Sequence, residues 1–390
     1  MKRIYLDCAA TTPMDIAVKK AMAPYFSDKF GNPGSLHFFG QEAMAAVDES
    51  REKIAKTIGA DFREIIFTGS ATESNNIALR GIIKNIPTPN AQRPTPRIII
   101  SAIEHESILE TCRDLEHEGI EIIYLPVDKR GIIDLKKLKE SLNEQTILVS
   151  IMYANNEIGT IQPIVEIAKI IKEFKEKNNY KLPLFHTDAV QAFQFLDCDI
   201  NNLKVDLMTL SAHKIYGPKG IGLLYVRALT PSPHTLNPII AGGGQEFGLR
   251  SGTENVAGIV GFAKAVELAV KNRKKETRRI SKLTGYFWKE IKKNCPSAKI
   301  NGALSNKLPN ILNIYFPNQN AQDLLMKFDL NGVAISSGSA CSARATKPSH
   351  VLKAIGLNDK KIKSSLRFSL GKFTTKEETN HTLKIIKKLL

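Results

Sequence analysis

Short β-branched runs alternate with amphipathic segments between residues 50 and 226, and this alternation restricts the fold more than any other feature of the sequence. In one helical segment Pro163 suits the first position, and the apolar residues at 164, 167, 168 and 171 follow the i, i+3, i+4, i+7 spacing of a helix. Strands that alternate with helices need crossover connections, so the sequence predicts a mainly parallel sheet covered on both faces. The seven predicted strands cover residues 64–69, 97–101, 121–127, 146–153, 182–188, 206–211 and 220–226.

The composition excludes several classes of protein. With 43% hydrophobic and 24% charged residues, the 390-residue chain has the composition of a globular protein. Its apolar runs fall short of the ~18 residues that a membrane span needs, and its first 13 residues lack the apolar core of a signal peptide. The five cysteines are scattered, without a C-x-x-C pair. We therefore expect a cytoplasmic protein without membrane association, disulfides or a metal site.

The pattern changes after about residue 265, where a basic helical segment precedes short strand-like runs and a closing helix. We expect a large α/β domain at residues 15–264 and a smaller α+β domain made of residues 1–14 and 265–390. Residues 271–294 hold ten Lys or Arg against two Glu, which is half of the net charge of +16. This segment is either the solvated face of a surface helix or a docking face for an acidic protein or RNA.

Polar side chains follow several predicted strands at the point where each strand ends. Ligands of open α/β sheets bind at these carboxyl ends, and a helix start with free amides and nearby hydroxyls binds phosphate. A phosphate cradle, a lysine and an aspartate placed in this way are what pyridoxal 5'-phosphate (PLP) requires. The lysine condenses with the aldehyde, and the carboxylate keeps the pyridine nitrogen protonated. The candidates are Ala71, Thr72, Asp188, Gln191, Ser211, His213 and Lys214.

Each candidate alone has a simpler interpretation. A lysine beside a glycine-rich turn is usually a surface residue, an aspartate after a strand is usually a cap, and GSATES can simply cap a helix. His105, just after the run at 97–101, can be a hydrogen-bonded structural histidine. Nucleotide and metal-dependent hydrolysis are weakly supported, because the chain has no Walker loop, no Rossmann fingerprint and no H-E-x-x-H motif. The prediction therefore depends on the co-occurrence and order of the candidates.

Ten segments in order along nearly the whole chain form a recognisable set: YLDCAATTP (5–13), GNPGSLH (31–37), GSATESNN (69–76), EHES (104–107), NNEIGT (155–160), HTDAVQ (186–191), SAHKIYGPKGIG (211–222), GGGQEFGLRSGTEN (242–255), SSGSAC (336–341) and SSLRFSLGKFT (364–374). With these segments the chain resembles a cysteine desulfurase of the NifS/IscS-like kind, within the class V aminotransferase group of fold-type I PLP enzymes. One departure is Cys8, where relatives usually carry a bulkier or amide side chain.

The resemblance implies a role for each matching residue. Lys214 would bind PLP covalently and move the Cα proton, Asp188 would pair with the pyridine nitrogen, and His105 would stack on the ring. Arg367 and Asn32 would hold the substrate carboxylate. Among the remaining cofactor contacts, Gln191 would reach the ring hydroxyl and Asn156 would also contact the cofactor. The phosphate would be held by Thr72 with Ala71, Ser211 and His213. Thr253 would reach the phosphate of the neighbouring subunit, which implies a homodimer with shared sites.

The resemblance also assigns Cys341, which stands among serines, glycines and alanines. Such a segment orders weakly, so its thiol can move between the site and an acceptor, and Arg344 or Lys347 can favour the thiolate. The implied reaction converts L-cysteine to L-alanine and leaves a persulfide on Cys341. An iron–sulfur scaffold or a sulfur carrier would receive the sulfur, for cluster assembly or tRNA thiolation.

Three alternatives to this reading stay open at this point. A selenocysteine lyase or another class V aminotransferase would share Lys214 and Asp188. A more remote alternative is a basic nucleic-acid-binding protein on a degenerate PLP fold.

Overall fold

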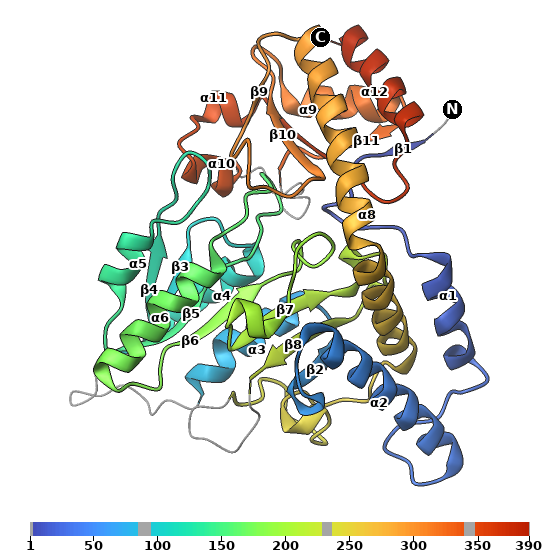
Figure 1. Ribbon diagram of the computed structural model, residues 1–390, viewed down its shortest axis with the longest axis vertical. Helices are drawn as coiled ribbons and strands as arrows, with labels where there is room; N and C mark the ends of the chain where they lie inside the picture. Colours follow the sequence, from blue (N-terminus) through green and yellow to red (C-terminus); the bar gives the residue numbers. More distant parts are fainter. Residues whose placement is uncertain (1–2, 85–94, 228–235, 339–347, 390) are drawn as a thin grey trace.

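The structure is a computed structural model that describes residues 3–84, 95–227, 236–338 and 348–389. Its largest element is a seven-stranded sheet with the order β2-β8-β7-β6-β5-β3-β4 (Figure 1). The strands are β2 (Ile65–Thr68), β3 (Arg97–Ser101), β4 (Glu121–Leu125), β5 (Thr146–Ser150), β6 (Leu184–Asp188), β7 (Leu207–Ser211) and β8 (Gly222–Val226).

The prediction of a mainly parallel seven-stranded sheet is confirmed. Neighbouring strands from β4 to β7 pair in parallel, whereas β8 is antiparallel to both β7 and β2. Residues 212–221 alone connect β7 to β8, and this connection is too short for a crossover helix. β8 therefore returns along β7 as a hairpin partner.

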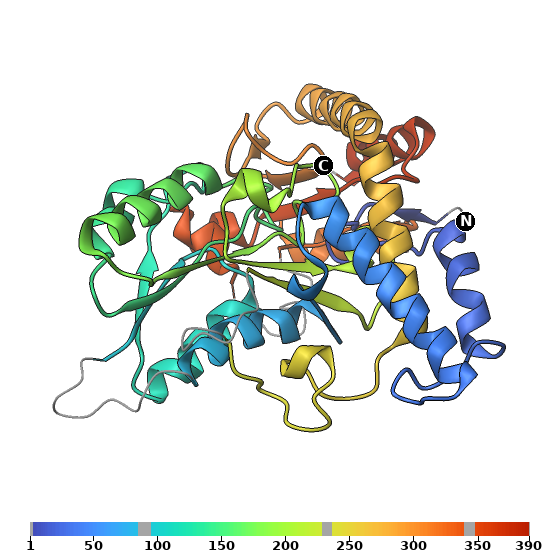
Figure 2. The same ribbon diagram turned by 60° about the horizontal axis from the view of Figure 1, so that its bottom comes forward.

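Helices cover both faces of this sheet, because the strands are apolar on both sides (Figure 2). On β3, Ile99 packs into one apolar core, and Ile98 and Ile100 pack into the other. The helices of the first core are α1 (Ile16–Met22), α2 (Phe38–Ile58), α5 (Leu135–Ser141), α6 (Ile164–Asn178), α7 (Ile200–Leu203) and the first part of α8 (Val256–Asn294). The helices of the second core are α3 (Ala71–Ile83) and α4 (Glu106–His117).

A second region has its own apolar core around Phe287, Phe328 and Phe368. Ile4 and Leu6 belong to this core, so the two ends of the described chain pack together. Its strands form two small sheets: β1 (Ile4–Tyr5) paired with β11 (Val333–Ala334), and the antiparallel sheet β12 (Ser365–Ser369), β10 (Ile311–Tyr315) and β9 (Lys299–Ile300). Its helices are α9 (Ala321–Leu330), α12 (Lys376–Leu389) and the end of α8. The helices α10 (His350–Ala354) and α11 (Asp359–Ile362) belong to a small adjoining cluster.

Helix α8 connects the two regions as one continuous element of 39 residues (Figure 1). It runs through the expected domain boundary at 264/265, so the division into residues 15–264 and 1–14 with 265–390 stays a prediction. Among the described residues, every helix is too short or too polar to cross a lipid bilayer.

Candidate active site

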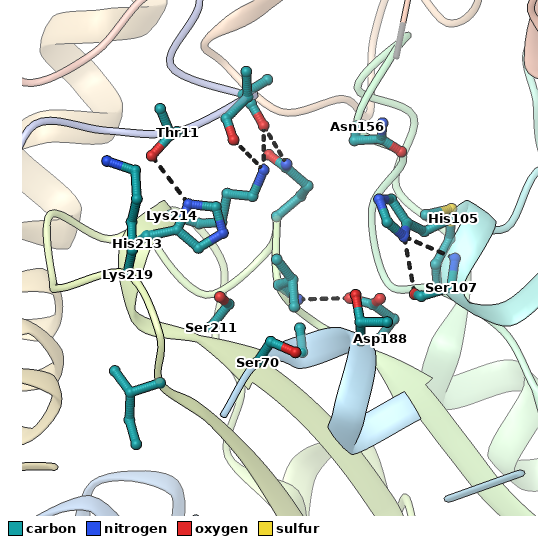
Figure 3. A pocket seen from close by; sticks show the side chains of 18 of the residues that line it. Thr11, Ser70, His105, Ser107, Asn156, Asp188, Ser211, His213, Lys214 and Lys219 are labelled. Carbon is teal, nitrogen blue, oxygen red and sulfur yellow. Dashed lines mark hydrogen bonds between the residues drawn. The ribbon is translucent and has the colours of Figure 1, made fainter. Parts of the chain in front are cut away.

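A cavity of about 390 Å³ lies where β5, β6 and β7 end, beside the first turns of α3 and α4 (Figure 3). Segments from both ends of the chain contribute to its wall. Ten of the residues predicted from the sequence line it: Ala71, Thr72, His105, Asn156, Asp188, Gln191, Ser211, His213, Lys214 and Arg367. Sequence reasoning missed other lining residues, among them Thr11, Ser107 and Lys219.

Asp188 is the last residue of β6, and its carboxylate is held from two sides. Its Oδ2 accepts a hydrogen bond from Asn75 Nδ2 at 3.0 Å, and its Oδ1 accepts one from the amide of Val190 at 3.0 Å. Asn75 lies on α3 and also donates to Ser107 Oγ at 2.8 Å. These contacts fix a carboxylate that is only 6% exposed at the cavity wall. Asn75 itself was not a sequence candidate, although it belongs to the quoted segment GSATESNN.

His105 is the N-cap residue of α4, so the start of this helix fixes its ring. Its Nδ1 accepts a hydrogen bond from the amide of Ser107 at 3.1 Å, which places the proton of the neutral ring on Nε2. Burial lowers the pKa of His105; the charge of Asp188 opposes this effect, and that of Lys214 adds to it. The imidazole is therefore neutral at neutral pH.

Lys214 ends a 3₁₀ turn that directly follows β7. Its Nζ donates to the carbonyl oxygens of Ala9 and Ala10, both at 2.7 Å, and Gln191 Nε2 donates to the same Ala9 oxygen at 2.9 Å. The N-terminal segment therefore lies against the cavity at the lysine. Tyr216 stands two residues later with a positive φ of 66°, and its amide donates to Thr12 Oγ1 at 2.8 Å.

The start of α3 forms a second, cationic end of the cavity. Ser70 caps the helix by accepting from the amide of Glu73, while the amides of Ala71 and Thr72 have no acceptor within the described part of the chain. Lys219 lines this cavity as well. A Cβ at Gly222 would lie 2.5 Å from the carbonyl carbon of Ser70, so only glycine lets β8 pack this closely on the turn. The arrangement suits a phosphate group.

His213 stands beside Lys214 and is fixed by the N-terminal segment. Its Nδ1 lies 3.0 Å from Thr11 Oγ1 (Figure 3). Burial lowers the pKa of His213 to about 4, and the charges of Lys214 and Lys219 act in the same direction. A neutral His213 can serve as a hydrogen-bond donor to an anion through one ring nitrogen.

Arg367 lies on β12 and reaches the cavity from the second region. Its side chain is 1% exposed, with Nη1 donating to the carbonyl of Asn156 at 2.9 Å and Nη2 donating to Asp7 Oδ1 at 2.8 Å. Its Nε is buried without a hydrogen-bond partner among the described residues. Nη1 and Nη2 each keep a second N–H, and the side chain lines the cavity. Arg367 can therefore receive a carboxylate from the cavity.

Three predicted residues are not part of this cavity. Thr253 lines a second cavity of about 230 Å³, which shares Gly220 and Ile221 with the first. Asn32 lines neither cavity, and its Oδ1 accepts from the amide of Gly34 at 2.9 Å. Cys341 lies outside the described residues. The proposed roles of these three residues stay predictions.

Cys8 lies close to the site but does not line the cavity. Burial raises the pKa of its thiol to about 12, and the charge of Asp7 adds to the shift. A Cβ at Gly371 would lie 2.4 Å from its sulfur. Cys8 is therefore a packed, protonated thiol in this structure.

Comparisons with known proteins agree in describing one family. The sequence model of the family described as Aminotransferase class-V matches residues 4–381. The chain is 48% identical to the cysteine desulfurase IscS of Dictyoglomus turgidum, covering 100% of this chain and 95% of the relative. It is 43% identical to the putative cysteine desulfurase IscS 1 of Bacillus subtilis, with full coverage of both.

Solved structures give the same result. A NifS-like protein, 38% identical, superposes with a TM-score of 0.90 over 100% of this chain and 99% of that chain. The protein SspA in complex with cysteine, 37% identical, has a TM-score of 0.82 over 96% of this chain and 100% of that chain.

Proposed function

This chain belongs to the class V aminotransferase family and, within it, to the cysteine desulfurases of the NifS/IscS-like kind, and we propose that it acts with PLP in the described cavity. The reaction converts L-cysteine to L-alanine and transfers the sulfur. The family expected from the sequence motifs is thereby confirmed, and a selenocysteine lyase, another aminotransferase or a nucleic-acid-binding protein is not favoured.

One observation carries the proposal for the cofactor: a single cavity combines Lys214, the fixed carboxylate of Asp188 and the uncapped amides at the start of α3. These groups match the aldehyde, the pyridine nitrogen and the phosphate of PLP. When bound there, PLP supplies an electron sink that stabilises negative charge at the substrate Cα. Ser211, Gln191 and Asn156 would complete its surroundings from the same wall.

Three side chains of the cavity handle charge and protons in the proposed reaction. Arg367 lines the cavity, binds the α-carboxylate of L-cysteine through its guanidinium and so orients the amino acid. Lys214 moves the proton at the substrate Cα, and the carbonyls of Ala9 and Ala10 orient its Nζ. His105 is neutral, with its proton on Nε2, and covers one side of the cavity.

We assign the sulfur transfer to Cys341. Its thiolate attacks the sulfur of the bound cysteine, the Cβ–S bond of the substrate breaks, and an S–S bond forms on Cys341. The substrate carbon skeleton takes up a proton at Cβ and one at Cα and leaves as L-alanine. The persulfide then passes to an iron–sulfur scaffold or a sulfur-carrier protein, which serves cluster assembly or tRNA thiolation. A cytoplasmic location is part of the same proposal.

We further propose a homodimer in which Thr253 reaches the phosphate of the neighbouring subunit. The support for this role is that Thr253 lines a cavity that shares Gly220 and Ile221 with the first cavity. Asn32 is proposed to contact the substrate in the assembled site. The ion pair between Arg250 and Glu73, at 2.8 Å, connects the loop before Thr253 to the start of α3.

The test is incubation of the PLP-loaded enzyme with L-cysteine in the absence of other thiols, followed by peptide mass spectrometry. We expect one added sulfur on the Cys341 peptide and about one alanine released per site, as the stoichiometry of a single transfer requires. Cys341→Ser should lose both products, whereas Cys8→Ser, which changes a buried thiol, should retain them. Alanine release without the persulfide would refute the assignment of Cys341, and no alanine despite bound PLP would refute the desulfurase reaction.

A further inference from the structure

Asp7 lies between Arg367 and Ser336, and none of the steps of the proposed reaction uses it. Its Oδ1 accepts from Arg367 Nη2 at 2.8 Å, and its Oδ2 accepts from Ser336 Oγ at 2.9 Å. The side chain of Asp7 is 13% exposed and that of Arg367 is 1% exposed. Arg367 lines the cavity, and Asp7 lies behind it as the partner in a nearly buried ion pair.

Backbone hydrogen bonds hold the three residues in register. The amide of Ser369, on the same strand as Arg367, donates to the carbonyl of Leu6 at 2.7 Å, and the amide of Cys8 donates back to Ser369 at 3.1 Å. Arg367 and Ser336 exchange two hydrogen bonds through their main chains, at 2.6 and 3.2 Å. The main chain around Asp7 is therefore held beside the strand that carries Arg367, within reach of the guanidinium.

The guanidinium of Arg367 has a defined division of its donors. One N–H of Nη1 donates to the carbonyl of Asn156 and one N–H of Nη2 donates to Asp7, so each of these nitrogens keeps a second N–H for a ligand, while Nε is buried without a partner among the described residues. A buried arginine needs a counter-charge, and Asp7 supplies it. An α-carboxylate that binds the same guanidinium brings a second negative charge within roughly 6 Å of the first, where like charges repel strongly at low dielectric.

We propose that Asp7 is a resident counter-ion of Arg367 that weakens the binding of amino-acid carboxylates and so determines how readily L-alanine leaves the site. This inference rests on the proposed function, in which Arg367 binds the substrate carboxylate. An unpaired, buried guanidinium would hold substrate and product carboxylates alike. With Asp7 present, the site remains electrically neutral after the product departs, so carboxylate exchange carries no large electrostatic penalty.

The substitution Asp7→Asn removes the charge while retaining the shape. The amide oxygen still accepts from Arg367 Nη2, and the amide nitrogen can donate to Ser336 Oγ. The probes are L-alanine and ethylamine, which is alanine without its carboxylate, titrated into the PLP-loaded enzyme by calorimetry or by the change in cofactor absorbance. We expect L-alanine to bind about tenfold tighter to Asp7→Asn, since solvent in the open cavity reduces the full repulsion. Ethylamine should change less than about twofold, because it lacks the charge that Asp7 repels.

Asp15→Asn is the matched control, because Asp15 is paired with Lys372 and does not line this cavity. It should leave both affinities unchanged. An unchanged or weaker L-alanine affinity in Asp7→Asn would overturn the proposal, and Asp7→Ser gives the same comparison if the asparagine variant does not fold. Failure of the proposed function is distinguishable, because it appears in the wild-type enzyme as the absence of alanine formation from L-cysteine.

Discussion

Glu104→Gln tests whether a buried carboxyl group behind the candidate active site carries a proton. Glu104 is 0% exposed and precedes His105 in the chain. The amide of Met152 donates to Oε1 and Oε2 at 2.9 and 3.1 Å, and the hydroxyl of Ser101 donates to Oε1. Burial raises the pKa of Glu104 to about 8, although the hydrogen bonds from Ser101 and Met152 act in the opposite direction. At neutral pH most folded molecules therefore carry the neutral acid.

The consequence for stability has a defined sign and pH window. The pKa of this glutamate is 4.5 in the unfolded chain and about 8 in the folded chain. Between these values the unfolded state has lost the proton that the folded state retains, so the free energy of unfolding falls by about 1.4 kcal/mol for each pH unit. From pH 5 to pH 8 the loss amounts to about 4 kcal/mol. Glutamine has no proton to lose, so the variant lacks this contribution.

The assay is urea unfolding of wild type and Glu104→Gln at several pH values between 5 and 8, with the same PLP concentration throughout. The stability of the variant relative to wild type should rise by about 4 kcal/mol across this range. Glu110→Gln, at an exposed position on helix α4, which begins two residues after Glu104, is the control and should follow the wild-type profile. Parallel profiles for wild type and Glu104→Gln would show that Glu104 is already ionised in the folded state and would refute the reasoning.

Two further predictions concern the elements that support the cavity. Glu246 accepts two hydrogen bonds from Arg51, at 2.7 and 2.8 Å. Glu246→Gln should therefore lower the free energy of unfolding in urea by about 3–5 kcal/mol, and a loss below about 1 kcal/mol would contradict this. Gly222→Ala should push the Ser70 turn out of place and weaken PLP binding about tenfold or more, equivalent to about 1.4 kcal/mol, in equilibrium dialysis. Gly285→Ala, with no neighbouring atom within 4 Å of the new Cβ, should retain wild-type affinity, and equal affinities in both variants would exclude the steric argument.

The seven strands were predictable because each is a short apolar run with buried residues on both faces. The end of β5 was not. The run at 146–153 continues to be apolar, but the strand stops at Ser150 and the amide of Met152 donates to the Glu104 carboxylate instead of to a neighbouring strand. On the β6 side the amides of Ile151 and Tyr153 still donate to His186 and Asp188, so it is the opposite edge that meets a side chain 48 residues away, and no local pattern reveals such a contact.

The candidate site shows the same distinction between local and distant information. Asp188 and Lys214 follow strand ends, where ligands of α/β sheets bind, so their position along the chain was informative. The pairing of Asp7 with Arg367 joins residues 360 positions apart. Spacing in the sequence carries no signal for it, because the contact arises only when β1 and β12 belong to one folded region.

The N-terminal segment that lies against Lys214 also constrains the order in which the protein can be completed during synthesis. Ile4 and Tyr5 pair with Val333 and Ala334, and the carbonyls of residues 9 and 10 accept from Lys214. The segment leaves the ribosome early, yet its partners are made hundreds of residues later, and chain-closing contacts of this length form slowly. The sheet can form while residues 3–12 are still unpaired. Arg367 lies on β12, so a nascent chain lacks this residue of the cavity until β12 has been synthesised.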